Sequence, residues 1–108
     1  MPDIREYITL DGKAPFTEWL NELRDRQTRA RIRTRLNRVR LGNFGDCKPV
    51  GEGVFELRMT FGAGYRVYYA SEHEHLILLL GGGDKSMQAR DIERAKAAWA
   101  DYRSRNDD

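Results

Sequence analysis

The chain has 108 residues, of which 33% are charged and 40% are hydrophobic, as expected for a single globular domain over residues 1–108 rather than for a disordered protein. No apolar run approaches the ~20 residues of a membrane span, and no secretory signal is visible, so we expect a cytoplasmic protein without a membrane partner. The net charge is only +2, and the single cysteine, Cys47, rules out an internal disulfide.

The N-terminal segment predicts a strand followed by a helix. Residues 3–10 contain β-branched and aromatic side chains, which are enriched in strands, and Asp11-Gly12 follows as a turn signal. Pro15 then stands where a helix prefers its first residue.

Two helices are predicted between residues 15 and 42. Apolar side chains mark them at helical spacing, first Phe16, Trp19, Leu20 and Leu23, then Ile32, Leu36 and Val39. The apolar pattern lapses between the two sets, and Gly42 is a typical C-terminal stop. The simplest arrangement is a hairpin of two antiparallel helices.

The second of these helices is strongly basic. Residues 24–40 contain eight arginines and one acid, Asp25. A guanidinium group can bind phosphate through two parallel hydrogen bonds, whereas the lysine ammonium is a point charge. Basic helix faces are often merely solvated, but this density of cations favours an anionic polymer as the partner. We therefore predict that Arg31, Arg35 and Arg38 contact RNA.

Residues 53–70 predict two strands joined by a glycine-bearing turn. Side chains alternate between apolar and polar in both strands, so we expect one face to pack on the core and the other to be polar. The polar face carries Glu56, Arg58, Arg66 and Tyr68. If Leu57 pairs with Val67, Arg58 lies opposite Arg66, and like charges are unfavourable there unless an anion sits between or above them.

The segments on either side of this hairpin complete the predicted sheet. Residues 43–53 are interrupted by glycine and proline, which indicates a loop with one short strand near residues 46–50. Residues 71–74 predict a polar turn. The uninterrupted apolar run of residues 75–80 then predicts a strand covered on both faces.

The chain ends in a predicted helix, in which Ile92, Ala95, Trp99 and Tyr102 repeat at steps of three and four. Gly81-Gly82-Gly83 predicts a flexible connection to it, and Asp84 or Ser86 is the candidate N-cap. The complete order is β-α-α-β-β-β-β-α. It predicts an α+β domain with a small, mostly antiparallel sheet, an N-terminal helical hairpin and a C-terminal helix.

Three separated motifs give the chain a resemblance to a known family. They are Phe55-Glu56-Leu57-Arg58, Gly64-Tyr65-Arg66-Val67-Tyr68-Tyr69 and Leu80-Gly81-Gly82-Gly83-Asp84-Lys85. With these motifs in this element order, almost the whole chain resembles the RelE/ParE superfamily of bacterial toxins. It is most similar to the HigB-like branch of addiction module killer proteins.

The resemblance implies the toxin of a type II toxin–antitoxin system. Nucleases of this superfamily enter the ribosomal A site and cut mRNA without a metal or another cofactor. The partners implied are the ribosome, mRNA and a cognate antitoxin, which is often a helix-turn-helix protein. The toxin would contact operator DNA only through this antitoxin. Two alternatives stay open: a DNA gyrase poison, as in the ParE branch, and a non-catalytic module that binds RNA or an antitoxin.

Metal-free cleavage through the RNA 2′-hydroxyl needs a base, an acid and cations that stabilise the anionic phosphorane. We predict Arg58 and Arg66 as the clamp on the scissile phosphate; arginine keeps its proton and does not act as a base. Lys85 is the first candidate for proton transfer, because it stands between a buried strand and a helix N-terminus. Tyr68 and Glu56 remain alternatives that would orient the 2′-hydroxyl or move the proton.

Two further cations are predicted to bind RNA. Lys48, on the strand or loop before the hairpin, would add phosphate affinity, and Arg90 lies near the start of the last helix. His73 and His75 lack a third ligand at metal-binding spacing, so no metal site is predicted.

Overall fold

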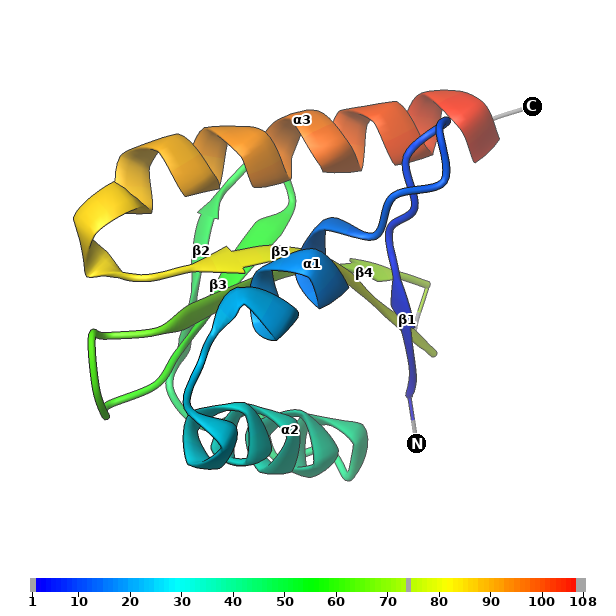
Figure 1. The fold of residues 1–108 in the computed structure, drawn as a ribbon. Coiled ribbons are helices and arrows are strands. Elements are labelled where there is room, and N and C mark those ends of the chain that lie inside the picture. The colour runs from blue at the N-terminus through cyan, green and yellow to red at the C-terminus, as the bar shows by residue number, and fades with distance from the viewer. Residues whose placement is uncertain (1, 74, 107–108) are drawn as a thin grey trace.

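Figure 1 shows the computed structural model of the chain, which describes residues 2–73 and 75–106. The elements are β1 (Asp3–Glu6), α1 (Pro15–Glu22), α2 (Arg26–Arg40), β2 (Cys47–Gly51), β3 (Val54–Arg58), β4 (Arg66–Glu72), β5 (Leu76–Gly83), the 3₁₀ turn η1 (Lys85–Met87) and α3 (Gln88–Asn106). The predicted α+β class and the predicted element order are confirmed. None of the helices in the described ranges is long and apolar enough to cross a membrane.

The five strands form one sheet in the order β1-β5-β4-β3-β2. Its pairings are antiparallel except for the parallel pairing of β1 with β5, so the prediction of a mostly antiparallel sheet is confirmed. β5 lies between β1 and β4, which explains why its sequence is apolar without alternation.

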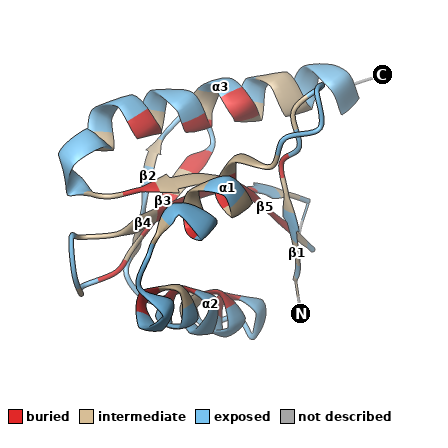
Figure 2. Ribbon diagram, in the orientation of Figure 1, coloured by how far each residue is buried: buried red, intermediate tan, exposed pale blue. Residues whose placement is uncertain are grey.

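Helices cover both faces of the sheet, α1 and α2 on one side and α3 on the other (Figure 1). The core between the sheet and helices α1 and α2 consists of Phe16, Leu20, Ile32, Leu36, Val39, Leu57, Met59, Val67, Tyr69, Ile77 and Leu79. The core between the sheet and α3 consists of Tyr7, Val54, Tyr68, Ala70, Leu78, Leu80, Ala95 and Ala98. Figure 2 shows that the side of α2 turned away from the sheet is exposed.

The face of the β3–β4 hairpin that the sequence analysis predicted to be polar is buried at its centre. Glu56 and Tyr68 are both 0% exposed, because this face packs under α3 together with Val54 and Ala70. Alternation correctly indicated which side chains share a face. It did not indicate that a helix distant in sequence covers that face.

The first strand is shorter than predicted. It ends at Glu6 rather than at residue 10, because the chain then turns, with the N–H of Gly12 donating to the carbonyl of Thr9 at 2.9 Å. Ile8 and Leu10 are consequently exposed.

The glycine run is the end of β5 and not a flexible connection, which corrects a second prediction. Gly83 pairs with Arg66, and Gly82 with Val67. A Cβ atom at Gly82 would collide with the ring of Trp19 from α1, and one at Gly83 with the carboxylate of Asp91 from α3. These glycines therefore allow both helices to pack closely on the sheet.

The remaining boundaries agree with the prediction to within a few residues. Gly42 ends α2 with a φ of +92°, and the short strand near residues 46–50 is β2. Asp84 caps η1, accepting a hydrogen bond from the N–H of Ser86 at 2.9 Å. Of the predicted turn at residues 71–74, the first two residues belong to β4, His73 turns with a φ of +58°, and Glu74 lies outside the described residues.

Candidate functional site

Arg58 and Arg66 lie directly opposite each other at the end of the β3–β4 ladder that adjoins the connecting turn, in the predicted register of Leu57 against Val67. Each guanidinium has its own carboxylate. Nε and Nη2 of Arg58 donate to the Asp46 carboxylate at 3.2 to 3.3 Å, and Nε of Arg66 lies 3.5 Å from Oε2 of Glu56. The like-charge pairing is therefore tolerated because two acids of this chain neutralise it.

The buried carboxylate of Glu56 is the centre of a polar network behind this ladder. Its Oε2 accepts hydrogen bonds from the Tyr68 hydroxyl at 3.0 Å and from Nε2 of Gln88 at 2.9 Å, and its Oε1 lies 4.0 Å from Nζ of Lys48. The Arg66 side chain is only 12% exposed. Glu56 thus pairs with the largely buried Arg66, and the half-exposed Lys48 lies at the edge of ion-pair distance from it.

Tyr68 takes part in this network as a hydrogen-bond donor. Burial, with the neighbouring Glu56 carboxylate, raises the pKa of the Tyr68 phenol far above neutrality. The hydroxyl therefore keeps its proton, which it donates to Glu56. In this structure neither Tyr68 nor Glu56 reaches the surface.

Lys85 lies beside Arg66 and, unlike Glu56 and Tyr68, is exposed. Its main-chain N–H donates to the carbonyl of Ala63 at 3.3 Å, and Nη1 of Arg66 donates to the carbonyl of Gly64 at 2.6 Å. A Cβ atom at Gly64 would lie 3.4 Å from both Nη1 of Arg66 and Cβ of Lys85. The structure therefore brings these two predicted site residues together around the turn between β3 and β4.

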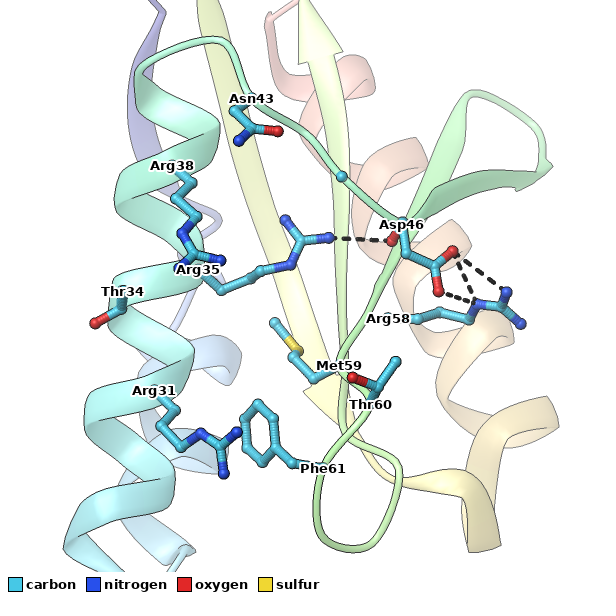
Figure 3. Close-up of a pocket in the computed structure, with 11 residues that line it drawn as sticks. Arg31, Thr34, Arg35, Arg38, Asn43, Asp46, Arg58, Met59, Thr60 and Phe61 are labelled. Carbon is cyan, nitrogen blue, oxygen red and sulfur yellow. Dashed lines mark hydrogen bonds and ion pairs between the residues drawn. The ribbon is translucent and has the colours of Figure 1, made fainter.

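A cleft of about 510 Å³ opens between α2 and two loops, residues 43–46 and 59–61 (Figure 3). Its charged lining residues are Arg31, Arg35, Arg38, Arg58 and one acid, Asp46. We refer to it as the arginine cleft. The steps of four and three between the three α2 arginines place them along one side of the helix, next to its buried stripe. Arg33 and Arg40 are exposed elsewhere on α2 and do not line the cleft.

The other two cations predicted to bind RNA lie outside the arginine cleft. Lys48 is an exposed residue of β2 that reaches toward Glu56. Arg90 pairs with Asp91 at 3.2 Å and lines a smaller depression of about 240 Å³ between α1 and α3. The predicted RNA-binding residues therefore divide into three places, of which only the Arg31, Arg35 and Arg38 set forms a shared surface.

Three residues of the site were missed by the sequence analysis. Asp46 binds Arg58, Gln88 binds Glu56, and the ring of Phe61 lies 4.0 Å below the guanidinium carbon of Arg31. Asp46 and Phe61 belong to loops without periodicity, and Gln88 is an ordinary polar residue at a helix start. One signal was available in the sequence: two arginines facing each other require nearby acids to neutralise them. That requirement alone did not identify Asp46 as the partner of Arg58.

The comparisons with known proteins cover this whole region. Residues 18–104 match the family described as phage derived protein Gp49-like (DUF891). A protein of Haemophilus influenzae (strain ATCC 51907 / DSM 11121 / KW20 / Rd), carrying only the description "Uncharacterized protein", is 48% identical over 89 residues, which cover 82% of this chain and 90% of the relative. The family match includes both the Glu56 network and the arginine cleft.

Proposed function

Because the chain belongs to the phage-derived Gp49-like (DUF891) family and carries an arginine-lined cleft, we propose that it is the toxin of a type II toxin–antitoxin system and cleaves mRNA on the ribosome. The observation that carries this proposal is the arginine cleft, whose charged lining residues are four arginines and one acid. A cationic groove beside an aromatic side chain suits single-stranded RNA. The expected reaction comes from the resemblance of three motifs of this chain to the HigB-like branch of the RelE/ParE toxins.

Arg58 takes the role of the exchangeable phosphate ligand. Its ion pair with Asp46 is about half exposed, 42% and 44% for the two side chains, and such pairs contribute only ~0–1 kcal/mol to stability. A phosphate can replace the Asp46 carboxylate with the same two-donor geometry. Arg66 is held by buried Glu56 and supplies a fixed positive charge next to that phosphate.

Lys85 takes the proton-transfer role, because it is exposed and adjoins Arg66. In the proposed step a water molecule takes the proton of the RNA 2′-hydroxyl, the 2′-oxygen bonds to phosphorus, and the bond from phosphorus to the 5′-oxygen breaks. The Lys85 ammonium protonates the leaving 5′-oxygen and then regains a proton from solvent. The products are a 2′,3′-cyclic phosphate and a 5′-hydroxyl. Glu56 and Tyr68, being fully buried, act as positioning residues for Arg66.

On this proposal the protein works in the cytoplasm with the ribosome and mRNA as partners. A cognate antitoxin, a helix-turn-helix protein in the simplest case, restrains it and connects it to operator DNA. No cofactor is assigned to the reaction.

The test is induced expression of the chain alone, with transcript 5′ ends mapped with and without a block of translation. We expect growth arrest and new 5′ ends inside translated regions, which disappear when translation is blocked and in the Lys85→Ala variant. Unchanged toxicity of the Arg58→Ala/Arg66→Ala variant would refute the site. Cleaved DNA–gyrase complexes in a supercoiling assay, without new mRNA ends, would replace the proposal by a gyrase poison. Normal growth with an intact transcript pool would indicate a non-catalytic binding module.

A further inference from the structure

At one end of the arginine cleft, the guanidinium of Arg31 stacks on the ring of Phe61. The guanidinium carbon of Arg31 lies 4.0 Å from the ring centroid of Phe61 (Figure 3). The Phe61 ring is also 5.8 Å, centroid to centroid, from the Tyr65 ring, at an interplanar angle of 51°. Phe61 is half-buried against the core, whereas Arg31 is exposed. The Arg31 side chain, which lines the cleft, is therefore accessible to a ligand. Guanidinium planes and aromatic rings are the surfaces on which unpaired nucleobases stack.

Arg35 provides a second feature, a cation held across the cleft. Its Nη2 donates to the main-chain carbonyl of Asp46 at 3.2 Å, a neutral acceptor (Figure 3). Gly45 makes room for it, since a Cβ atom there would come within 2.9 to 3.3 Å of the guanidinium atoms of Arg35. Burial lowers the pKa of Arg35 from its usual value, but arginine remains protonated at neutral pH. A partly buried cation whose hydrogen bond is to a neutral carbonyl attracts an anion more strongly than a fully solvated one.

The size and spacing of the cleft suit one nucleotide. Its volume of about 510 Å³ lies within the ~300–1,000 Å³ typical of small-molecule sites. Arg31 lies one helical turn before Arg35, and Arg38 about one turn after it, so the stacking plane is followed by two phosphate ligands along the same side of α2. A base can reach the Arg31 plane only when it is not paired in a duplex.

We propose that the arginine cleft binds one nucleotide of single-stranded RNA, with its backbone phosphate on Arg35 and Arg38 and its base stacked on the Arg31–Phe61 pair. The choice of RNA as the polymer rests on the proposed function. Lys85 does not line the arginine cleft, so this site is separate from the proposed proton transfer, whereas Arg58 lines the cleft. It would fix the strand that passes Arg58 and thus determine which phosphate is cut.

Binding is measured by fluorescence anisotropy with the purified full chain and a short fluorescein-labelled oligoadenylate, 2′-O-methylated so that it cannot be cleaved. Arg35→Ala and Arg38→Ala should each reduce the slope of log affinity against log salt by about 0.7, the value for one phosphate contact on a single strand. Arg33→Ala and Arg40→Ala remove the same charge from exposed positions of α2 outside the cleft and are the matched controls. Equal effects of cleft and control variants would overturn the proposal.

The stacking part is tested without changing charge. Arg31→Lys and Phe61→Leu keep the charge and the apolar packing, respectively, and should weaken binding roughly 5- to 100-fold, the range measured for removal of a base-stacking side chain, with the salt slope unchanged. A blunt RNA duplex should compete poorly. Unchanged affinity of both variants, or equal binding of the duplex, would refute a base-stacking site.

These outcomes are independent of the proposed reaction. Cleft-dependent RNA binding by a protein that cuts no mRNA in cells would support the binding site and refute the nuclease. Translation-dependent cleavage that continues at the same mRNA positions in Arg35→Ala and Phe61→Leu would support the nuclease and refute the binding site.

Discussion

Arg58 and Arg66 face each other across the β3–β4 ladder, yet they differ in how firmly each is held. Arg58 pairs with Asp46 in solvent, whereas Arg66 is 12% exposed and pairs with a Glu56 side chain that is fully buried. Breaking an exposed pair has a small effect on stability, and removing one partner of a buried pair leaves a charge without compensation. One arginine is therefore available to a ligand, and the other is part of the fold.

Replacing Arg58 with alanine should remove activity while preserving the fold. We expect translation-dependent mRNA cleavage to fall by about 10²–10³-fold, the usual effect of removing one donor that stabilises a transition-state oxyanion. The free energy of unfolding in urea should change by no more than about 1 kcal/mol. Arg40→Ala, which removes an exposed arginine of α2, is the control for charge and should leave both quantities near the wild-type values. Wild-type cleavage by Arg58→Ala would contradict the assignment.

Replacing either member of the buried pair should instead lower stability. Glu56→Gln and Arg66→Met should each reduce the free energy of unfolding by about 3–5 kcal/mol, because the remaining charge stays buried without its partner. The double variant should lose much less than the sum of the two single losses, which a double-mutant cycle in urea measures. Additive losses would show that Glu56 and Arg66 are not coupled.

Asp46 is predicted to compete with RNA for Arg58. Asp46→Asn should increase the affinity for the methylated oligoadenylate several-fold at low salt, because it releases Arg58 and removes the acid that lines the arginine cleft. The gain should shrink as salt screens the charges. Asp11→Asn makes the same charge change at an exposed position outside the cleft and should have little effect. A gain in both variants would mean that net charge, rather than Asp46, is responsible.

Residues within one hairpin were predictable, and residues that meet across the fold were not. The alternation of apolar and polar side chains was enough to place Leu57 against Val67 and so Arg58 opposite Arg66. The burial of Glu56 depends on α3, which begins 32 residues later with Gln88 at the same carboxylate. A periodic pattern reports the direction of a side chain but not what covers it.

The arginine cleft was predictable only in part. The spacing of Arg31, Arg35 and Arg38 placed them on one side of a helix, but the same segment offered Arg33 and Arg40 at comparable spacing. The cleft exists because two loops without periodicity bring Asp46 and Phe61 opposite the first set. Likewise, Gly81-Gly82-Gly83 has the composition of a loop, but its pairing with β4 makes it a strand, and Trp19 and Asp91 occupy the space that side chains at Gly82 and Gly83 would need.

The close packing at Gly82 gives a stability test with an internal control. Gly82→Ala should destabilise the fold by about 1–3 kcal/mol or more, because the new Cβ atom overlaps the Trp19 ring and α1 must move. At Gly81, in the same strand, a Cβ atom meets nothing within 4 Å, so Gly81→Ala should be neutral or stabilising by about 0.4–1 kcal/mol. Urea unfolding of the two variants distinguishes this packing role from a general need for flexibility, which would make both substitutions harmful.

The N-cap at Asp84 should make part of the stability depend on pH. The hydrogen bond from the Ser86 hydroxyl, followed by that from the Ser86 N–H, lowers the pKa of the Asp84 carboxyl from its ordinary value of 3.8. A carboxyl whose pKa is lowered on folding stabilises the protein above its unfolded pKa and loses that contribution as the pH falls through the folded pKa. Asp84→Ala should therefore cost about 1 kcal/mol at pH 7, and the difference from wild type should shrink as the pH is lowered from about 4 toward 2.

Asp84→Asn separates the charge of this cap from its hydrogen bonds. Asparagine caps helices about as well as aspartate but has no carboxyl to protonate, so the difference between Asp84→Asn and Asp84→Ala should be the same at every pH. Urea unfolding of the three proteins between pH 7 and pH 2 measures both differences. If the wild type keeps its full advantage over Asp84→Ala at the acid end, the ionised carboxylate is not what stabilises the turn that leads from Lys85 into α3.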